Sequence, residues 1–196
     1  VTEIYNTRNE KIAEAIFRYR PTSEGGVCVH VVFSPDTTHV RSLARVGLTC
    51  ELAGDCNRIE YLGRGEAETY ADRKQCGIIG IYRTSPERMF HPYVVPQATG
   101  NRTDVRWVRL TDADGFGIGI QALRPFEFSA LPFTDRMLEQ CRHINELKRS
   151  DRITLHVDAV QAGVGTATCG PSVRPEYRVP LTVQEFEFTI YPQKRP

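Results

Sequence analysis

Apolar and polar side chains alternate with a period of two residues along most of this chain. In residues 27–33, valine and phenylalanine at every second position alternate with Cys28, His30 and Val32. This period places successive side chains on opposite faces of an extended strand, so it predicts strands that each bury one face. Clusters of Gly, Asp and Pro separate these segments and favour turns. The predicted strands cover residues 15–20, 27–33, 46–52, 58–62, 105–110, 116–121, 153–157 and a final strand through Phe186, Phe188 and Ile190.

Short turn segments join two pairs of these strands into hairpins. The linkers are Ser-Glu-Gly-Gly at 23–26 and Asp-Ala-Asp-Gly at 112–115, and both are rich in residues that hairpin turns favour. One segment has helical spacing instead, because Thr134 or Asp135 can cap a short helix that runs to about Leu147. The pattern therefore predicts an antiparallel all-β sandwich with one short helix.

Composition and charge fit one ordinary globular domain. A chain of 196 residues with 40% hydrophobic content can bury a core without metals or disulfides, so a single domain over residues 1–196 is expected. The 25 Lys and Arg residues nearly balance the 24 Asp and Glu residues, which argues against nucleic acid or an anionic membrane as a partner. Apolar stretches such as residues 77–81 are far shorter than the roughly 20 residues of a membrane span.

The six cysteines indicate neither a metal site nor a disulfide scaffold. They contain no C-x-x-C pair, and their spacing is sparse for a chain of this length. Cys28 and Cys50 lie inside alternating segments, where a free cysteine behaves as a small core residue. We therefore expect six unpaired thiols and no metal ligands.

Two pairs of acidic residues are spaced closely enough to suggest glycosidase chemistry, which uses paired carboxylates. The pairs are Glu66 with Glu68, and Asp112 with Asp114. The first pair follows a glycine turn, and the second lies in a predicted hairpin turn, where Asp bonds its own backbone. A structural role is therefore expected for both pairs, and no catalytic residue is predicted in this chain.

The most unusual segment is residues 163–173, which combine glycines, small hydroxyl residues and a proline. This composition predicts a loop whose backbone bends sharply or is approached closely by another group. Ordered loops on rigid β scaffolds often carry binding residues, so this loop is a candidate binding element.

Four ordered sequence blocks carry a family resemblance that spans roughly residues 41–196. The blocks are Arg45-Val46-Gly47-Leu48; Tyr61-Leu62-Gly63-Arg64-Gly65 with Glu68, Tyr70, Asp72 and Arg73; Pro92-Tyr93-Val94-Val95-Pro96-Gln97 with residues 100–107; and the glycine-rich loop through Thr168-Cys169-Gly170-Pro171. Together they resemble the last domain of family 2 β-galactosidases of the lac-operon type, which is also called the β-galactosidase small chain.

Three positions bear on how closely the chain follows this family. Glu66 stands where the family usually has proline, and Ala98 stands where it usually has glutamate. Cys169 occupies a position at which some members place a tryptophan that walls the sugar site and other members place a cysteine. The resemblance therefore identifies Cys169 as the substrate-binding residue of this chain.

The resemblance implies a galactose-mutarotase-like β-supersandwich that is part of a much larger chain. It implies hydrolysis of terminal non-reducing β-D-galactosides with retention, by two glutamates on a (β/α)8 barrel whose motifs do not occur here. The expected partners are that barrel and a galactoside at a shared pocket, in a homo-oligomeric parent. Magnesium and sodium would be bound by other domains of the parent, so no cofactor is expected in this chain.

Two other interpretations stay open at this point. A stand-alone carbohydrate-binding or mutarotase-like module would need a positioned His and Glu as acid and base, and the five scattered histidines offer no convincing pair. A separately encoded small subunit of a split β-galactosidase would share every feature described above. The absence of an initiator Met before Val1 favours a domain of a longer chain.

Overall fold

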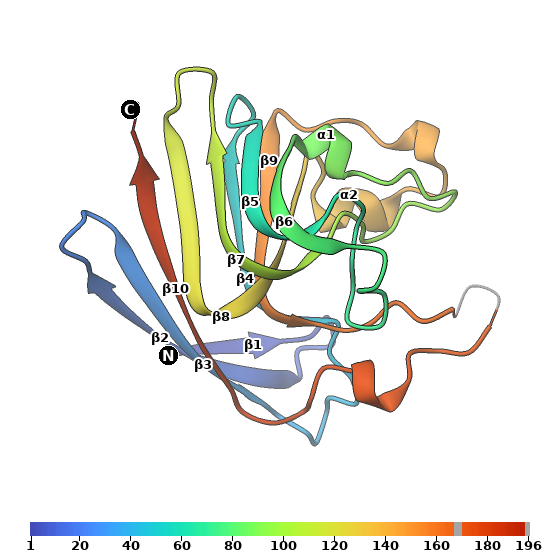
Figure 1. The fold of residues 1–196 in the computed structure, drawn as a ribbon. Coiled ribbons are helices and arrows are strands. Elements are labelled where there is room, and N and C mark those ends of the chain that lie inside the picture. The colour runs from blue at the N-terminus through green and yellow to red at the C-terminus, as the bar shows by residue number, and fades with distance from the viewer. Residues whose placement is uncertain (167–169, 195–196) are drawn as a thin grey trace.

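The structure of the chain, a computed structural model, describes residues 1–166 and 170–194. These residues form ten strands in antiparallel pairs with two short α-helices (Figure 1), which confirms the predicted fold class. Neither α-helix of the described residues has the length and apolar character that crossing a bilayer requires. The elements are β1 (Thr2–Tyr5), β2 (Lys11–Pro21), β3 (Val27–Pro35), β4 (Arg45–Ala53), β5 (Arg58–Gly65), β6 (Ile78–Thr84), α1 (Pro86–Met89), β7 (Arg102–Thr111), β8 (Gly117–Leu131), α2 (Asp135–Gln140), β9 (Arg152–Gln161) and β10 (Gln184–Gln193), with 3-10 turns at Ile144–Glu146 and Pro175–Tyr177.

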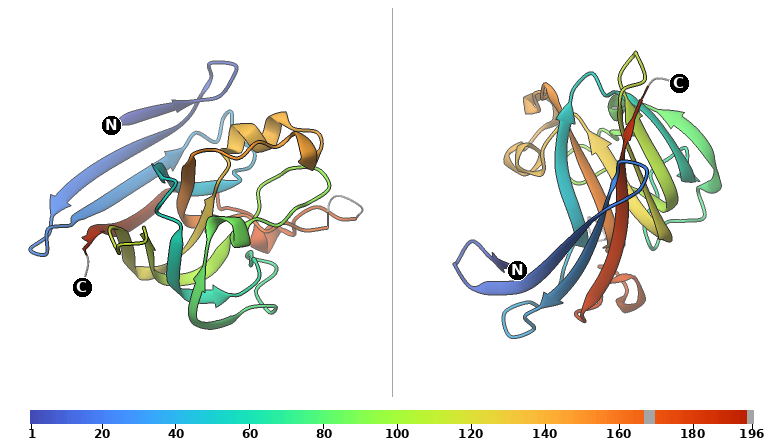
Figure 2. Two further views of the ribbon diagram at one scale, coloured as in Figure 1. Left: turned by 90° about the horizontal axis from the view of Figure 1, so that it is seen from above. Right: turned by 90° about the vertical axis from the view of Figure 1, so that its left-hand side faces the viewer.

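The strands are hydrogen-bonded into one sheet that forks at β8. The main path runs β1-β2-β3-β10-β8-β7-β5-β6, and β9 and β4 branch from β8. Residues 117–121 of β8 pair with β10, whereas residues 127–131 pair with β9. Figure 2 shows the two branches from two further sides, with the β2–β3 hairpin and β6 at opposite ends of the sheet.

The fork lies where β8 changes its neighbour. Residues 122–125 pair with neither β9 nor β10. Pro125 has no backbone N–H to donate to an adjacent strand, so this stretch is poorly suited to continuous pairing. The side chain of Leu123 is 99% exposed there. β8 therefore contributes to both branches and connects their packing.

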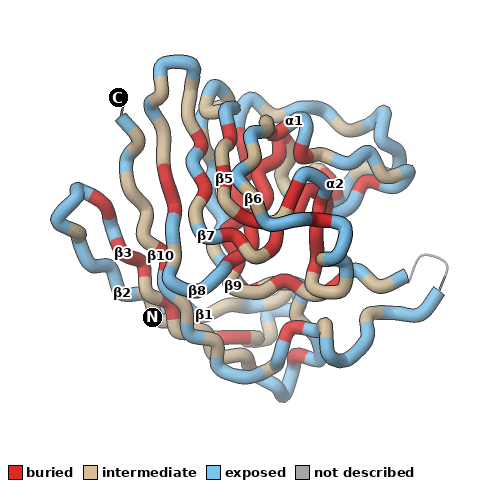
Figure 3. The backbone as a smooth tube through the Cα atoms, viewed as in Figure 1, coloured by how far each residue is buried: buried red, intermediate tan, exposed pale blue. Residues whose placement is uncertain are grey.

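The hydrophobic core is built from the inward faces of β5, β7, β8 and β9, with one side chain from each α-helix. Tyr61 and Phe128 pack edge to face with ring centroids 5.1 Å apart, and Phe126 packs in the same way on Phe188 of β10 at 5.5 Å. Met89 of α1 and Leu138 of α2 join this cluster. Figure 3 shows the buried residues gathered around these elements, while most residues in the two strands of the β2–β3 hairpin are only partly buried or exposed.

β9 is buried on both faces. Its apolar face contributes Ile153, Leu155 and Val157 to the core. Its other face carries Thr154, His156 and Asp158, which are also buried. His156 lies 3.1 Å from Asp135 of α2 and 3.0 Å from Thr49 of β4, so hydrogen bonds compensate for burying its imidazole. Oδ2 of Asp158 accepts no hydrogen bond from the described residues, and its nearest cation is the Arg45 guanidinium at 3.7 Å.

Both predicted hairpins are confirmed. β2 pairs with β3, and β7 pairs with β8, in antiparallel registers. In the β7–β8 turn, Oδ1 of Asp112 accepts hydrogen bonds from the backbone N–H groups of Asp114 and Phe116 at 2.8 and 3.0 Å. The predicted structural role of this acidic pair is therefore confirmed for Asp112.

The helical regions differ from the prediction in two respects. α2 begins after the Thr134 cap, as expected, but it ends at Gln140 and does not continue to Leu147. The carboxylate of Glu146 accepts hydrogen bonds from the backbone N–H groups of Arg142 and His143, which starts a separate turn. A second helix, α1, was not predicted, although Ser85 followed by Pro86 is a helix-start signal.

The cysteines are unpaired in the part of the chain that the structure describes. Cys28, Cys50, Cys56, Cys76 and Cys141 are free thiols. Cys28 is buried, as predicted, but Cys50 is exposed, so the expectation that it lies in the core is wrong. Within the described residues β4 pairs only with β9, and this edge position leaves its middle open to solvent. Cys169 lies outside the described residues.

Two substitutions in β8 test the position of the core. Phe128 is 0% exposed, so Phe128→Ala should lower the free energy of unfolding by about 3–5 kcal/mol, because it removes buried area and leaves a cavity. Leu123→Ala, at the exposed fork, should change it by less than about 0.5 kcal/mol. Urea unfolding of both variants measures the difference, and equal losses would contradict the assigned core.

Candidate functional site

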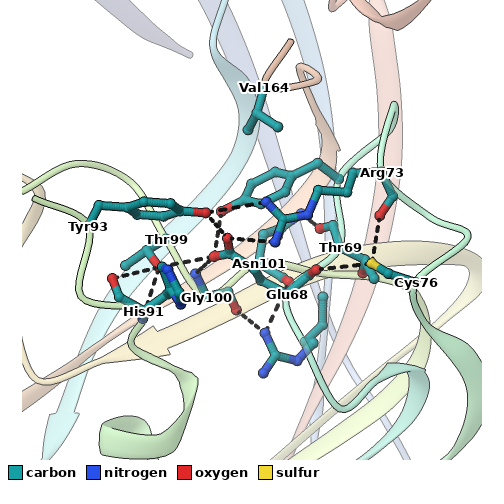
Figure 4. A network of polar contacts seen from close by, with 12 residues as sticks. Glu68, Thr69, Arg73, Cys76, His91, Tyr93, Thr99, Gly100, Asn101 and Val164 are labelled. Carbon is teal, nitrogen blue, oxygen red and sulfur yellow. Dashed lines mark hydrogen bonds and ion pairs between the residues drawn. The ribbon is translucent and has the colours of Figure 1, made fainter. Parts of the chain in front are cut away.

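Three segments that are distant in sequence meet at one polar network. They are the loop between β5 and β6, the loop between α1 and β7, and the start of the loop after β9. A hydrogen bond from the backbone N–H of Thr69 to the carbonyl of Asn101, at 2.9 Å, joins the first two loops. Figure 4 shows their side chains around Glu68, with Val164 of the third loop nearby.

Glu68 is the centre of this network. Its residue is only 5% exposed, so its carboxylate must find partners within the protein. It is surrounded by four hydrogen-bond donors and one guanidinium. The partners are the Tyr93 hydroxyl, the Tyr70 hydroxyl at 3.2 Å, the Thr99 hydroxyl at 3.0 Å, the Gly100 N–H at 2.8 Å and the Arg73 guanidinium at 3.3 Å.

The electrostatics of Glu68 favour its charged form. Burial alone raises the pKa of Glu68, but the hydrogen bonds from Tyr93, Gly100 and Thr99 and the charge of Arg73 outweigh burial and hold its pKa below the ordinary value. An acid with a lowered pKa is a poor proton donor at neutral pH. Glu68 is therefore an anchor for the surrounding loops. The other acid of this predicted pair, Glu66, is exposed.

Tyr93 and Arg73 carry the network to the protein surface. The Tyr93 hydroxyl donates to Glu68 and accepts a hydrogen bond from Arg73 at 3.3 Å. Burial and the bond to Glu68 raise the pKa of Tyr93, so the phenol stays protonated and keeps donating. The ring of His91 packs against Tyr93 at a centroid distance of 4.4 Å.

A second buried carboxylate lies beneath this network. Oε2 of Glu127 accepts a hydrogen bond from Nδ2 of Asn101 at 2.5 Å, and Oε1 accepts one from the backbone N–H of Gln161 at 3.3 Å. Asn101 also donates to the Thr69 carbonyl at 3.0 Å. Because Gln161 ends β9, Glu127 connects the start of β7 to the start of the glycine-rich loop.

The surroundings of Glu127 favour its neutral form. Burial raises the pKa of Glu127 to about 7, and two hydrogen bonds offset this only in part. Asp158, its pairing partner across β8 and β9, has a pKa raised to about 6, again by burial. Burial thus favours the neutral form of both neighbouring carboxyls.

The described start of the glycine-rich loop is attached to Asp72. Its Oδ1 accepts a hydrogen bond from the Val164 N–H at 3.0 Å, and its Oδ2 accepts one from the Gly165 N–H at 2.7 Å. A Cβ atom on Gly163 would lie 2.5 Å from the Asp72 carboxyl carbon, and Gly165 has a φ of +58°. Both glycines are therefore required by the local geometry, one by close approach and one by its backbone conformation.

Exposed apolar side chains lie beside the network. Val94 is 84% exposed and Val95 57% exposed, and both directly follow Tyr93 in the chain. Val164, which lies close to the Tyr93–Glu68 network in Figure 4, is also exposed. The residues next to the polar network therefore include three exposed valines, Val94, Val95 and Val164, which are the apolar rim of this region.

The structure brings together residues from two of the sequence blocks. Glu68 from one block contacts Tyr93 and Gly100 from the other, and Arg73 from the first block contacts Tyr93. The predicted substrate-binding residue, Cys169, lies outside the described residues, and the described flanks of its loop are joined by a 3.1 Å hydrogen bond from the Thr166 N–H to the Pro171 carbonyl.

Sequence reasoning missed the role of Glu127. Its position between Phe126 and Phe128, in a strand buried on both faces, is the signal that marks it as a buried acid. The functions of Asp72 and Glu68 as loop anchors were also missed, because these residues were noted only as parts of a motif. Long-range hydrogen bonds of this kind leave no periodic pattern in the sequence.

A separate cleft of about 630 Å³ lies at the fork between β8 and β10 and shares no lining residue with the network. His30 and Glu185 in this cleft are 2.8 Å apart and bind each other, so they do not present a separate acid and base. Among residues 1–166 and 170–194, no group of three or more His, Cys, Asp and Glu side chains is arranged to hold a metal ion.

Comparison with known proteins links this arrangement to one family. A family model described as "Beta galactosidase small chain" matches residues 1–191, so the likeness begins well before the expected start near Arg41. A β-galactosidase from Actinobacillus pleuropneumoniae is 32% identical over 88% of this chain and 16% of its own length. The β-galactosidase BgaC of Bifidobacterium adolescentis is 31% identical over 88% of this chain and 18% of its own length. A β-galactosidase from Streptococcus thermophilus is 36% identical over 67% of this chain and 13% of its own length. The chain thus spans less than a fifth of these relatives.

The buried carboxyls predict a specific pH dependence of stability. Because the pKa of Glu127 is raised from 4.5 to about 7 on folding, its contribution to stability is fully present below about pH 4.5 and is lost as the pH rises through 7. This loss amounts to roughly 3 kcal/mol. Glu127→Gln should therefore make the fall in unfolding free energy between pH 5 and pH 8 shallower.

Urea unfolding at several pH values measures this slope. Asp158, whose pKa is also raised, should leave a residual slope of the same sign in the variant. Glu24→Gln, in the exposed β2–β3 turn, is the matched control and should keep the original profile. A Glu127→Gln profile parallel to that of the unmodified chain would show that Glu127 does not titrate in this range.

Proposed function

This chain belongs to the β-galactosidase small-chain family, and on that premise we propose that it forms one β-sandwich domain of a larger enzyme that hydrolyses β-galactosides. The share of the relatives that it covers supports this proposal, because each named β-galactosidase is several times longer than the matched segment. The remaining length provides room for a separate catalytic domain.

In this enzyme the chain supplies one wall of the sugar pocket. The observation that carries this role is the network around Glu68, which ties two motif loops together at the surface, beside the glycine-rich loop held by Asp72. Binding sites are commonly built from loops that a rigid scaffold positions. A loop fixed in this way binds ligand without first losing its own conformational freedom.

The bond-breaking groups belong to another domain. Retaining hydrolysis of terminal non-reducing β-D-galactosides needs two carboxyls about 5–5.5 Å apart, one of which acts as an acid. Glu68 is fully engaged by its partners, with a lowered pKa, and does not suit the acid role. Two glutamates of a (β/α)8 barrel in the same enzyme would perform the reaction.

The apolar rim is the surface through which this chain contacts the barrel. Val94, Val95 and Val164 are exposed in the chain alone, and packing against a second domain would remove them from water. As the family resemblance implies, magnesium and sodium would be bound by other domains of the parent enzyme. The parent enzyme would assemble as a homo-oligomer.

A deletion experiment tests this proposal. Three proteins are assayed on an aryl galactoside: the full-length enzyme, the isolated 196-residue chain, and the full-length enzyme without this segment. Only the first should release galactose efficiently, and the other two should be slower by several orders of magnitude, since each lacks part of the site. Circular dichroism confirms that each protein is folded. Turnover by the isolated chain, or undiminished turnover after deletion, would contradict the proposal.

Cys169 remains the proposed substrate contact of this chain. A cysteine offers much less apolar area than the tryptophan of some family members, so it should leave a wider pocket with weaker stacking. Cys169→Trp in the full-length enzyme should change KM for lactose and for an aryl galactoside unequally. The difference corresponds to a change in binding free energy of about 1–3 kcal/mol at most. Lys194→Ala, at the exposed end of the chain, is the control. Unchanged kcat/KM values for both substrates would show that Cys169 has no role in substrate binding.

A further inference from the structure

We propose that Asp72 is a positioning residue that fixes the backbone at the start of the glycine-rich loop, residues 163–165, and thereby sets the affinity of the enzyme for galactosides. This inference rests on the proposed function, because it concerns the same sugar pocket. It assigns to Asp72 no contact with the substrate. Its effect is exerted through residues 163–165, whose backbone follows the Asp72 carboxyl group.

The two oxygens of one carboxyl group bind two successive backbone amides. Oδ1 accepts from the N–H of Val164 at 3.0 Å, and Oδ2 accepts from the N–H of Gly165 at 2.7 Å. Hydrogen bonds to a carboxylate are shorter and stronger than those between neutral groups. This double contact fixes the direction of the peptide plane as well as its distance from Asp72.

The loop has the sequence needed to approach this carboxyl group. Gly163 lies so close to Asp72 that any Cβ atom would overlap it, and Gly165 adopts a positive φ that side chains disfavour. The Gly163 N–H is itself bonded to the Tyr177 carbonyl at 2.8 Å. Three consecutive backbone amides are thus held, two of them by Asp72.

Asp72 is in turn held by a compact turn. The Arg73 N–H donates to the Tyr70 carbonyl at 2.8 Å, and the side chains of Tyr70 and Arg73 both contact Glu68. Neighbouring residues therefore serve different loops, since Asp72 binds the glycine-rich loop and Arg73 binds the Tyr93 hydroxyl. This arrangement sets the separation between the two loops.

Loss of the Asp72 carboxyl group should affect substrate binding more than bond cleavage. A displaced loop weakens contacts made in the ground state and the transition state alike, which raises KM with little change in kcat. A misplacement of about 1 Å can reduce efficiency by up to about 100-fold. We expect Asp72→Ala to raise KM for an aryl galactoside by about 10- to 100-fold.

The test uses the full-length enzyme with three variants. Asp72→Asn keeps the shape of the side chain and one acceptor oxygen, so its KM should lie between those of the unmodified enzyme and Asp72→Ala. Asp112→Ala is the matched control, because Asp112 also accepts two backbone N–H groups, through one oxygen in the β7–β8 turn. It should leave KM unchanged, within about twofold. Hydrogen exchange of the peptide that contains residues 163–166 should accelerate most in Asp72→Ala, less in Asp72→Asn, and not at all in Asp112→Ala.

The outcomes separate this inference from the proposed function. The positioning role is supported if KM is largest for Asp72→Ala, intermediate for Asp72→Asn and unchanged for Asp112→Ala, with faster exchange at residues 163–166. An unchanged KM for Asp72→Ala in an enzyme that loses activity when this domain is deleted overturns the inference and leaves the proposed function standing. A fall in kcat for Asp72→Ala that tracks a lower melting temperature, with KM unchanged, also overturns it, because that is a stability effect. Full activity after deletion of the domain instead contradicts the proposed function.

Discussion

The burial of one carboxylate, that of Glu68, sets the arrangement of the loops on this face of the domain. A buried charge without partners is strongly unfavourable, so the chain must bring donors to it. Tyr93 and Gly100 come from a loop that is separated from Glu68 by the whole of β6 and α1. The free energy of solvating this charge therefore selects the conformation of two loops that share no regular secondary structure. Loosening either loop would leave the carboxylate with too few partners.

Glu127 shows what happens when a buried carboxyl has fewer partners. Hydrogen bonds from Tyr93, Gly100 and Thr99, with the charge of Arg73, lower the pKa of Glu68. Burial raises the pKa of Glu127 to about 7, because its two hydrogen bonds offset burial only in part. Asn101 connects the two levels, since it donates to Glu127 and lies between Thr69 and Gly100. Glu68 is thus stabilised in its charged form by its partners, and Glu127 is stabilised in its neutral, protonated form. The contacts of both residues meet at the start of β7 and hold it in place.

Sequence periodicity predicted the elements that bury one face and failed where that condition does not hold. The β2–β3 and β7–β8 hairpins were predicted because their alternation is regular. β9 was predicted too short, since both of its faces are buried and His156 and Asp158 interrupt the apolar pattern. The end of α2 depends on the Glu146 side chain, and the exposure of Cys50 depends on the edge position of β4, and neither is a local property. The motif blocks are local and were visible in the sequence. Their convergence on Glu68 depends on long-range contacts and was not visible.

The combination of rigidity and exposed apolar surface shows how this face can serve a partner domain. Loop tips that expose valines, such as Val94, would normally adapt their shape when another surface approaches. Here Tyr93, the residue before Val94, is held by Glu68 and Arg73, so the tip can move little without breaking those bonds. A fixed apolar surface loses less conformational entropy on docking than a mobile one. In the proposed enzyme, the polar network beneath the rim would therefore favour association with the partner domain, even though its own groups need not touch that domain.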